Sequence, residues 1–420
     1  MFRDLILHPS IPMSSIAFLH PDLGIGGAER LIVDLALALK DCGHSVIIFT
    51  SHHNRDHCFE ETNNGQIPVM TAGDWIPRST FGSFMAFWAY IRMIYLTIYL
   101  ILNYRFDLII CDQVPSGVPI LKAFKHKCLF YCHFPDQLLS KHDSFLKKIY
   151  RFPIDFFEEW AIGYSDMILV NSYFTDEVFH RTFKSLSNIS TKVLYPSVNF
   201  NKSIPEKIPS TLNTKLKNMD AVFLSINRYE KKKNIELAIE ALKALYDKFN
   251  YVEEKDRSLI HLIIAGGYDL QNIENLEYAE ELNQLAKRLR IKPHVTFMKN
   301  LTNEQKQFLF QRCTAVIYTP ENEHFGIVPL EAMYMSRPVI AANSGGPRET
   351  IINNETGFLC QPNSPESFAE AMHRFIENKT LSNQMGAKGH DHVIEKFNHQ
   401  KFKNELNKIV TNLILINQHE

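Results

Sequence analysis

The chain has 420 residues, of which 45% are hydrophobic and 22% are charged, and its formal net charge is -1. This ordinary globular composition excludes disordered and fibrous proteins, and the length is sufficient for two domains with separate cores. Because the net charge provides no bulk field for nucleic acid, we expect no nucleic-acid partner. Seven cysteines without a C-x-x-C pair argue against a disulfide framework or zinc ribbon and favour a reducing compartment.

The N-terminal region predicts a βαβ unit. Residues 1–13, MFRDLILHPSIPM, lack the apolar core of a secretory signal. From Ser15 an apolar run, a glycine-rich turn and an apolar face at helical spacing lead to another apolar run. The turn GIGGAE contains Gly26 and Gly27, which could let the backbone approach a phosphate at a helix start. A tight turn without a ligand is an equally good interpretation, because the full dinucleotide fingerprint is missing.

The stretch 84–102, FMAFWAYIRMIYLTIYLIL, approaches the length of a membrane span and has Arg92 as its only charge. A helix in contact with the membrane surface and a buried helix of an α/β domain are about equally compatible with it. A true span is the weakest interpretation. Candidate site residues lie on both sides of this stretch in the sequence, and a single span would separate them across the bilayer.

The rest of the chain alternates apolar runs with helical patterns. The runs FDLIICD, KCLFYCHF and DMILVNS precede a polar connector, and AVFLSIN, LIHLIIAGG, HVTFM, CTAVIYT and RPVIAAN follow it. The pattern predicts an α/β fold with two Rossmann-like, doubly wound domains facing a central cleft. We expect domains at 1–200 and 219–380, a linker at 201–218, and C-terminal helices at 381–420 that return to the first domain.

Three strand ends carry candidate site residues. RYEKKKN places Arg228 and Lys233 after AVFLSIN, where two cations would suit a diphosphate, although a lysine run is more often a solvated loop. No D-x-D motif occurs, so such side chains would have to neutralise the leaving group of an activated diphosphate donor. His133 follows an apolar run, where a lone histidine is more often structural than catalytic.

The segment YTPENEHFGIVPLEAM, residues 318–333, contains two glutamates, Glu323 and Glu331. The run from Cys313 predicts a strand, and Pro329 predicts the first position of a helix with Glu331 in its first turn. The helix dipole would favour an ionised Glu331, while Glu323 would stay on the loop over the strand ends. An N-terminal charge and an ordinary loop glutamate are the alternative.

RYEKKKN and ENEHFGIVPLEAM resemble the Arg-x4-Lys and Glu-x7-Glu signature of retaining family 4 glycosyltransferases of GT-B fold, with GIGGAE and CHFPD at the places of the glycine loop and the cleft histidine. YCHFPDQLL, RFPIDFFEEW, VLYPS and EHFGIVPLEAMYMSRPVIAANSGGP are similar to the mannosyltransferases that extend a dolichol-diphosphate-linked core in N-glycan precursor assembly. The similarity covers nearly the whole chain. Asn234 departs from it, because many members have glycine there, which suggests a less close-packed phosphate loop.

The resemblance implies a role for each matched residue. Glu331 would accept hydrogen bonds from the donor ribose, and Glu323 would lie beside the transferred mannose. Arg228 and Lys233 would hold the diphosphate. The other donor contacts would come from Gly26 and Gly27, from His133 near the primary hydroxyl of the sugar, and from the backbone of Phe325, Gly326 and Ile327.

The reaction implied is transfer of mannose from GDP-mannose, with retention, in α1,3 and then α1,6 linkage. We expect front-side attack and no metal or other cofactor. The expected partners are GDP-mannose, a dolichol-diphosphate-linked oligosaccharide, the membrane surface and other glycosyltransferases of the pathway. Because GDP-mannose is a cytosolic donor, the expected location is the cytosolic face of the endoplasmic reticulum membrane. The N-x-S/T triplets would then stay unmodified.

Two alternatives remain open from the sequence. A family 4 transferase with another nucleotide sugar or lipid acceptor would show the same Glu-x7-Glu pattern. A catalytically silent scaffold of a glycosyltransferase complex could keep the fold, although every motif residue is present. A pyridoxal-dependent phosphorylase is less compatible, because this chain is short for one and has no lysine in a convincing Schiff-base setting.

Overall fold

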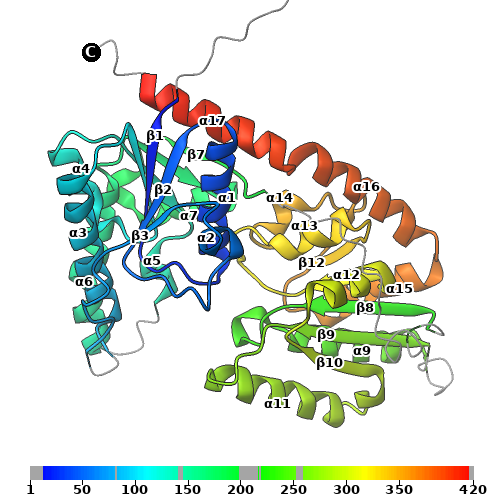
Figure 1. Ribbon diagram of the computed structural model, residues 1–420. Helices are drawn as coiled ribbons and strands as arrows, with labels where there is room; N and C mark the ends of the chain where they lie inside the picture. Colours follow the sequence, from blue (N-terminus) through cyan, green and yellow to red (C-terminus); the bar gives the residue numbers. More distant parts are fainter. Residues whose placement is uncertain are drawn as a thin grey trace, which may run out of the picture. The chain divides into compact units, whose positions relative to one another are not determined.

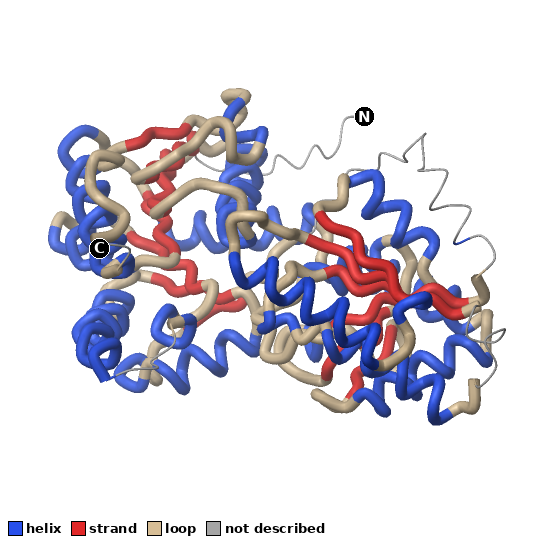
Figure 2. The backbone as a smooth tube through the Cα atoms, turned by 90° about the horizontal axis from the view of Figure 1, so that it is seen from below, coloured by secondary structure: helices blue, strands red, loops and turns tan. Residues whose placement is uncertain are grey.

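The computed structural model describes residues 13–80, 83–140, 145–197, 216, 219–251 and 259–415. Residues 1–12 and nearly all of the predicted linker lie outside the described residues. The chain divides into two compact units, Met1–Ser197 with His399–Glu420, and Val198–Asn398. In each unit the strands run side by side between helices (Figure 1 and Figure 2). The predicted pair of Rossmann-like domains is confirmed.

Unit 1 contains a parallel seven-stranded sheet in the order β3-β2-β1-β4-β5-β6-β7. Its strands are β1 (Ser15–His20), β2 (Ser45–Thr50), β3 (Val69–Thr71), β4 (Leu108–Asp112), β5 (Cys128–Cys132), β6 (Met167–Val170) and β7 (Thr191–Val193). Its α-helices are α1 (Gly27–Asp41), α2 (Glu60–Asn63), α3 (Met85–Asn103), α4 (Val118–Ala123), α5 (Asp136–Leu139), α6 (Phe145–Ile162), α7 (Tyr173–Thr182) and α17 (His399–Leu415). The described part of this unit also contains the 3-10 helices η1 (Pro115–Gly117) and η2 (Lys184–Leu186).

The sheet of unit 1 is buried on both faces. Ile16 and Phe18 of β1 join a core cluster with residues of α1 and α17, whereas Ala17 and Leu19 join a second cluster with residues of α3. Strand side chains point alternately to opposite faces, so a strand covered on both sides is apolar at nearly every position. Figure 1 shows α17 alongside α1.

Helix α3 contains the long apolar stretch and is the crossover between β3 and β4. Met93, Leu96 and Leu100 are fully buried against the sheet, and Arg92 is buried as well. The opposite face exposes Leu102 and other apolar side chains. The helix is long and apolar enough to cross a membrane, but it joins two strands of one sheet. One face of α3 therefore packs in the core of unit 1, and the opposite face leaves apolar side chains exposed.

Unit 2 contains a parallel six-stranded sheet in the order β10-β9-β8-β11-β12-β13. Its strands are β8 (Ala221–Ile226), β9 (Ile260–Gly266), β10 (Val295–Lys299), β11 (Ala315–Tyr318), β12 (Val339–Ala342) and β13 (Gly357–Cys360). Its helices are η3 (Lys231–Lys233), α9 (Glu236–Lys248), α11 (Ile273–Arg288), η4 (Lys292–His294), α12 (Asn303–Arg312), α13 (Ile327–Tyr334), α14 (Pro347–Thr350), α15 (Pro365–Glu377) and α16 (Leu381–Lys396). The strand order reverses between β8 and β11, where sheets of this kind bind ligands.

The C-terminal helices differ from the expectation. The sequence predicts that 381–420 returns as a whole to the first domain, whereas α16 belongs to unit 2 and only α17 belongs to unit 1. Helix α16 stays in unit 2 because its glycines let it approach the end of α13 closely. A Cβ atom at Gly386 would lie 2.0 Å from the carbonyl oxygen of Ser336, and one at Gly389 would lie 3.0 Å from Cγ of Met333.

Candidate active site

The two strands beside the switch point of unit 2 bring Lys233 and Glu323 together. Lys233 follows β8 and Glu323 follows β11, and these strands are neighbours. The Lys233 Nζ donates to Glu323 Oε2 at 2.5 Å, with side-chain exposures of 13% and 22%. Residues that are 90 positions apart therefore form a shielded ion pair at the carboxyl end of the sheet.

The end of strand β11 and the residue after it supply further groups that hold this pair. The Thr319 hydroxyl donates to the carbonyl oxygen of Lys233 at 2.8 Å, and the Tyr318 side chain hydrogen-bonds to Glu323. Burial disfavours the ionised form of Glu323, but the charge and hydrogen bond of Lys233 outweigh it and lower the pKa of Glu323. Burial and the nearby Glu323 carboxylate raise the pKa of Tyr318, so this phenol stays a neutral donor.

The loop that carries Glu323 is shaped by the SGGP segment after β12. The Gly346 N–H donates to the Glu323 carbonyl at 2.8 Å, and the Ser344 hydroxyl accepts from the Asn322 N–H at 3.0 Å. A Cβ atom at Gly346 would lie 2.4 Å from Cα of Phe325. The sequence analysis missed these glycines as residues that shape the candidate site, although the double glycine after an apolar run signals a close backbone approach.

Helix α13 begins two residues before the predicted start at Pro329. Gly326 is its N-cap at φ 82°, a conformation that glycine adopts readily, so the chain enters the helix at Ile327. Pro329 is tolerated because the first four helical N–H groups have no intrahelical partner. The prediction that Glu331 lies in the first turn is therefore wrong. Gly326 provides no side-chain cap, so the N–H groups here suit an anion or hydroxyl.

Glu331 has one satisfied and one unsatisfied carboxylate oxygen. Oε1 accepts from Lys306 Nζ of α12 at 2.6 Å. Oε2 is buried and has no hydrogen-bond partner in the part of the chain that the structure describes. Because buried acceptors are nearly always paired in native proteins, this atom is suited to accept from a ligand hydroxyl. The predicted ribose contact of Glu331 stays a prediction, and Lys306 is a neighbour that the sequence analysis missed.

Arg228 does not join the Lys233–Glu323 pair through any contact that the structure describes. Its side chain is 63% exposed, and its Nη1 donates to Glu230 Oε1 at 3.0 Å. Its predicted diphosphate contact remains a prediction. Asn234, the position that departs from the family glycine, has φ 48°. Asparagine is among the residues that tolerate this left-handed conformation, so Asn234 adopts it without a glycine.

The glycine loop of unit 1 leads into α1. Gly26 is the N-cap in an extended conformation without a side-chain cap, and Gly27 is the first helical residue. A Cβ atom at Gly26 would meet the movable end of Glu29, whereas nothing lies within 4 Å of one at Gly27. The described contacts of the chain therefore do not require glycine at position 27, and the approach of a donor phosphate would be one reason for it.

Replacing Gly27 by alanine distinguishes the two interpretations of the glycine loop, a phosphate-binding site and a tight turn without a ligand. The added methyl group has room, so thermal stability should stay equal or rise slightly, because alanine favours a helix more than glycine does. If a donor phosphate approaches this backbone, KM for the donor should rise about 10-fold, which corresponds to about 1.4 kcal/mol. Steady-state kinetics and a melting curve check both. An unchanged KM would favour the ligand-free turn.

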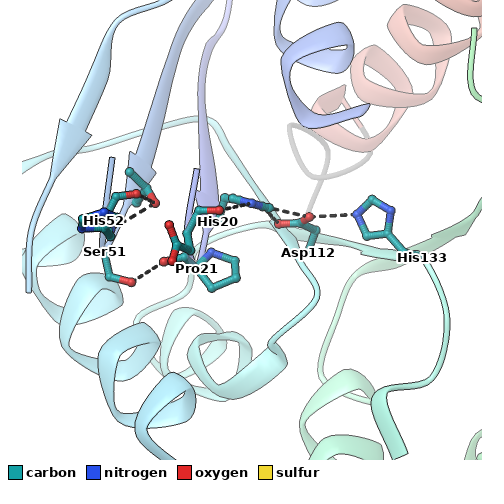
Figure 3. A network of polar contacts seen from close by, with 8 residues as sticks. His20, Pro21, Ser51, His52, Asp112 and His133 are labelled. Atoms are coloured by element: carbon teal, nitrogen blue, oxygen red, sulfur yellow. Dashed lines mark hydrogen bonds and ion pairs between the residues drawn. The ribbon is translucent and has the colours of Figure 1, made fainter. Parts of the chain in front are cut away.

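Two groups hold His133, which follows β5. Its Nε2 donates to Asp112 Oδ2 at 2.9 Å (Figure 3). Its carbonyl accepts from Asn171 Nδ2 at 3.0 Å. The Oδ1 atom of Asp112 also accepts a hydrogen bond from Nδ1 of His20 at 2.8 Å. His20 and Asp112 end β1 and β4, the neighbours at the switch point of unit 1. The sequence analysis missed both, although a polar residue at the end of an apolar run is a usable signal.

The predicted residues fall into two groups. Gly26, Gly27 and His133 belong to unit 1, and the other candidates belong to unit 2. The cleft that would join the two groups remains a prediction. Among the described residues no group of three His, Cys, Asp or Glu side chains could hold a metal ion. Metal-independent transfer also stays a prediction.

Two family models match the chain, Glycosyltransferase Family 4 over residues 25–202 and Glycosyl transferases group 1 over residues 211–410. The chain is also 48% identical to the human alpha-1,3/1,6-mannosyltransferase ALG2, over 97% of this chain and 98% of the human protein. It belongs to the ALG2 family. The ALG2 protein of Saccharomyces cerevisiae is 44% identical over 80% of this chain and 71% of the yeast protein.

Solved glycosyltransferases share the fold of this ALG2 family member. Sucrose-phosphate synthase from Thermosynechococcus elongatus matches with a TM-score of 0.73 at 18% identity, covering 95% of this chain and 98% of that one. Anabaena HepE in complex with UDP and glucose matches with a TM-score of 0.70 at 20% identity, covering 95% and 100%. The predicted family, the GT-B fold and the assignment as a glycosyltransferase are confirmed.

Proposed function

We propose that this chain transfers mannose from GDP-mannose to a dolichol-diphosphate-linked Man-GlcNAc2 core, in α1,3 and then α1,6 linkage. The similarity to the human alpha-1,3/1,6-mannosyltransferase over nearly the whole of both chains carries this proposal. The shielded Lys233–Glu323 pair supports it, because a donor with a diphosphate leaving group needs a fixed cation beside the bond that breaks.

The proposed chemistry is a front-side displacement. The bond from the anomeric carbon of mannose to the β-phosphate oxygen breaks, and a bond to the acceptor hydroxyl forms on the same face. The acceptor proton passes to the departing phosphate, so the products are GDP and the extended core. Lys233 and Arg228 neutralise the growing charge on the diphosphate, and no metal is required.

Glu323 acts in this scheme as a fixed anion beside the sugar, which carries oxocarbenium character. Its engagement by Lys233 and Tyr318 supports that role over nucleophilic attack. Glu331 binds the ribose through its unpaired Oε2. Trapping a mannosyl ester on Glu323 would contradict front-side displacement and support a two-step mechanism.

The test is mannose transfer from GDP-mannose to a short lipid-linked Man-GlcNAc2 diphosphate, with chelator present, by wild type and by Glu323→Ala. Transfer by the wild type alone supports the reaction, the metal independence and the site together. Transfer restored only by added Mg²⁺ would contradict the metal independence. A wild type that binds GDP but transfers only another sugar, from a donor panel, would point to a different family 4 reaction.

We also propose that unit 1 binds the cytosolic surface of the endoplasmic reticulum membrane, where a lipid-linked acceptor is accessible. Helix α6 supports this, because its apolar stripe faces solvent instead of the core. Phe145, Ile149, Phe152 and Phe156 recur at helical spacing and are 76%, 56%, 74% and 67% exposed. The exposed Lys147 and Lys148 neighbour this stripe, as suits a headgroup region.

The buried face of α6 carries charged residues, so the helix has the reverse of the usual arrangement, with apolar side chains outside and charged ones inside. Arg151 is buried and pairs with Asp136 and Asp155, and Glu158 is 2% exposed. Helix α3, which also exposes apolar side chains, packs beside α6, since its buried Tyr90 contacts Phe157 at 5.8 Å between ring centroids (Figure 1). An apolar stripe exposed to water does not stabilise the protein, whereas the same stripe would be buried favourably at a bilayer interface.

Replacing Phe152 and Phe156 together by serine should lower partitioning to phospholipid vesicles about 10-fold, because two phenyl rings no longer enter the interface. The matched control is Leu270→Ser in unit 2, which removes a side chain that is equally exposed, at 74%. Cosedimentation with vesicles of phosphatidylcholine and phosphatidylinositol measures both. Equal losses for the two variants, or none for the phenylalanine pair, would contradict α6 as the binding face.

A further inference from the structure

The His20–Asp112–His133 cluster of unit 1 contains more chemistry than the proposed transfer uses. Both ring nitrogens of His20 face acceptors. Nδ1 lies 2.8 Å from Asp112 Oδ1, and Nε2 lies 3.1 Å from the carbonyl oxygen of Asp22. A neutral imidazole has a single N–H group, so both hydrogen bonds exist only in the imidazolium form. His20 is therefore the cation of a fully buried ion pair.

Asp112 is fixed as a carboxylate by this cation. It is completely buried, and burial alone would favour its protonated form. The charges and hydrogen bonds of His20 and His133 outweigh burial and lower the pKa of Asp112, while the pKa of His20 is raised despite burial. Both oxygens of Asp112 accept hydrogen bonds from the two histidines, so the buried carboxylate needs no water as a partner.

The carboxylate of Asp112 determines which nitrogen of His133 carries the proton. Because Oδ2 can only accept, the Nε2 of His133 at 2.9 Å has to be the N–H group. The other nitrogen, Nδ1, then keeps its lone pair in the neutral ring and can accept a hydrogen bond from a hydroxyl. Asn171 holds the backbone of the same residue, and the bond from Nε2 to Asp112 sets both the ring direction and the tautomer.

The same cation is connected to the glycine loop. Asp22, whose carbonyl accepts from His20, lies on the segment between β1 and Gly26. The carbonyl of the preceding Pro21 accepts from the Ser51 hydroxyl, as Figure 3 shows. His20 thus ties the start of the glycine loop and the His133 ring to one carboxylate.

We propose that Asp112, held as an anion by the His20 imidazolium, is a positioning residue that fixes the Nε2–H tautomer of His133 and presents Nδ1 to a hydroxyl of the transferred sugar. This inference rests on the proposed function for the identity of the sugar. The arrangement of the three side chains does not depend on it. Asp112 acts through His133 and touches no substrate itself.

The first test reads the tautomer directly and requires no activity. Enzyme labelled with ¹⁵N-histidine is measured at neutral pH by long-range ¹H–¹⁵N correlation, and loss of one signal set in each of His133→Gln and His20→Gln assigns the two rings. We expect His133 with its proton on Nε2 and His20 protonated on both nitrogens. In Asp112→Asn we expect His133 to shift toward the Nδ1–H form. A wild-type His133 protonated on Nδ1, or a neutral His20, would overturn the proposal.

The second test is a double-mutant cycle in the mannose-transfer assay. Asp112→Asn and His133→Ala should each lower kcat/KM for GDP-mannose about 10- to 100-fold, the range expected for a misplaced contact group. Adding Asp112→Asn to His133→Ala should cost less than about 2-fold more, because coupled residues are not additive. Multiplying losses would assign Asp112 a general structural role and overturn the proposal.

Failure of the two proposals is distinguishable. If the wild type transfers no mannose, the proposed function fails, while the tautomer measurement still decides the role of Asp112. A melting curve and a far-UV circular dichroism spectrum of each variant show whether it folds, because the substituted residues all belong to unit 1 and GDP binding in unit 2 would not report on them. Should Asp112→Asn not fold, the wild-type spectrum alone supports or overturns the tautomer.

Discussion

Replacing Lys233 by methionine is expected to lower kcat/KM for GDP-mannose about 100- to 1,000-fold, the loss typical of removing one group that stabilises transition-state charge. The ammonium of Lys233 is 2.5 Å from Glu323 and 13% exposed, whereas Arg228, the other cation proposed for the diphosphate, pairs with Glu230. Its loss removes a cation from the leaving diphosphate and leaves the Glu323 carboxylate in a shielded site without its partner.

The pH profile should change in a defined direction. In the wild type, Lys233 opposes the effect of burial and keeps the pKa of Glu323 low. Without Lys233, burial raises the pKa of Glu323, so the carboxylate becomes protonated at a higher pH than before. The residual activity of Lys233→Met should therefore disappear at higher pH on the acid side than that of the wild type. The pH dependence of kcat/KM measures this shift.

Lys232→Met is the matched control, because this neighbouring lysine carries the same charge but its side chain does not contact Glu323. Its side chain is 66% exposed and pairs with Glu230, away from Glu323. We expect less than about a 2-fold change, since exposed ion pairs contribute little. Comparable losses for the two lysines would mean that the general charge of the loop matters, and that the Lys233–Glu323 pair has no special role.

The three consecutive lysines also show what the sequence could and could not predict. By composition alone they are a basic loop, and Lys233 was predicted as a site residue from its place after an apolar run and from the family signature. The structure supplies the physical reason: η3 turns Lys233 toward β11, while Lys231 pairs with Glu281 and Lys232 with Glu230. The motif identified Lys233, and the pairing of β8 with β11 explains why Lys233 lies beside Glu323.

The fold was predictable because its strands are buried on both faces. Runs such as AFLH in β1 contain nearly uninterrupted apolar residues, which few other environments permit. The start of α13 and the destination of α16 were not predictable in the same way. The first depends on the left-handed conformation of Gly326, and the second on how closely Gly386 approaches Ser336. Both are contacts in three dimensions that periodicity does not encode.

Much of the candidate site arises from pairs that are distant in sequence. His20 and Asp112 are 92 positions apart, and each ends an apolar run without a motif of its own. Lys306 lies 25 positions from Glu331 on a different helix. Strand order brings such residues together, so they become recognisable once the sheet topology is known. A sequence pattern identifies groups with fixed local spacing, as in Glu-x7-Glu, more readily.

Replacing Gly346 by alanine is expected to lower kcat/KM about 100-fold by displacing the loop that carries Glu323. The new Cβ atom would lie 2.3 Å from the carbonyl oxygen and 2.4 Å from the Cα of Phe325. Both are backbone atoms, so the loop itself has to move. It also leads into Gly326, the N-cap of α13, so the helix that carries Glu331 should be displaced as well.

The free energy of unfolding should fall by about 1–3 kcal/mol in Gly346→Ala, as for other overpacked sites. Gly163→Ala is the control, because its Cβ atom would meet a movable methyl group of Leu186 at 3.0 Å and lies outside the candidate site. We expect little loss of activity from that change. GDP affinity and transfer kinetics, measured with urea unfolding, separate displacement of the site from loss of the fold. If Gly346→Ala keeps activity within about 3-fold of the wild type, well short of the expected loss, the loop does not need this close approach to hold Glu323 in place.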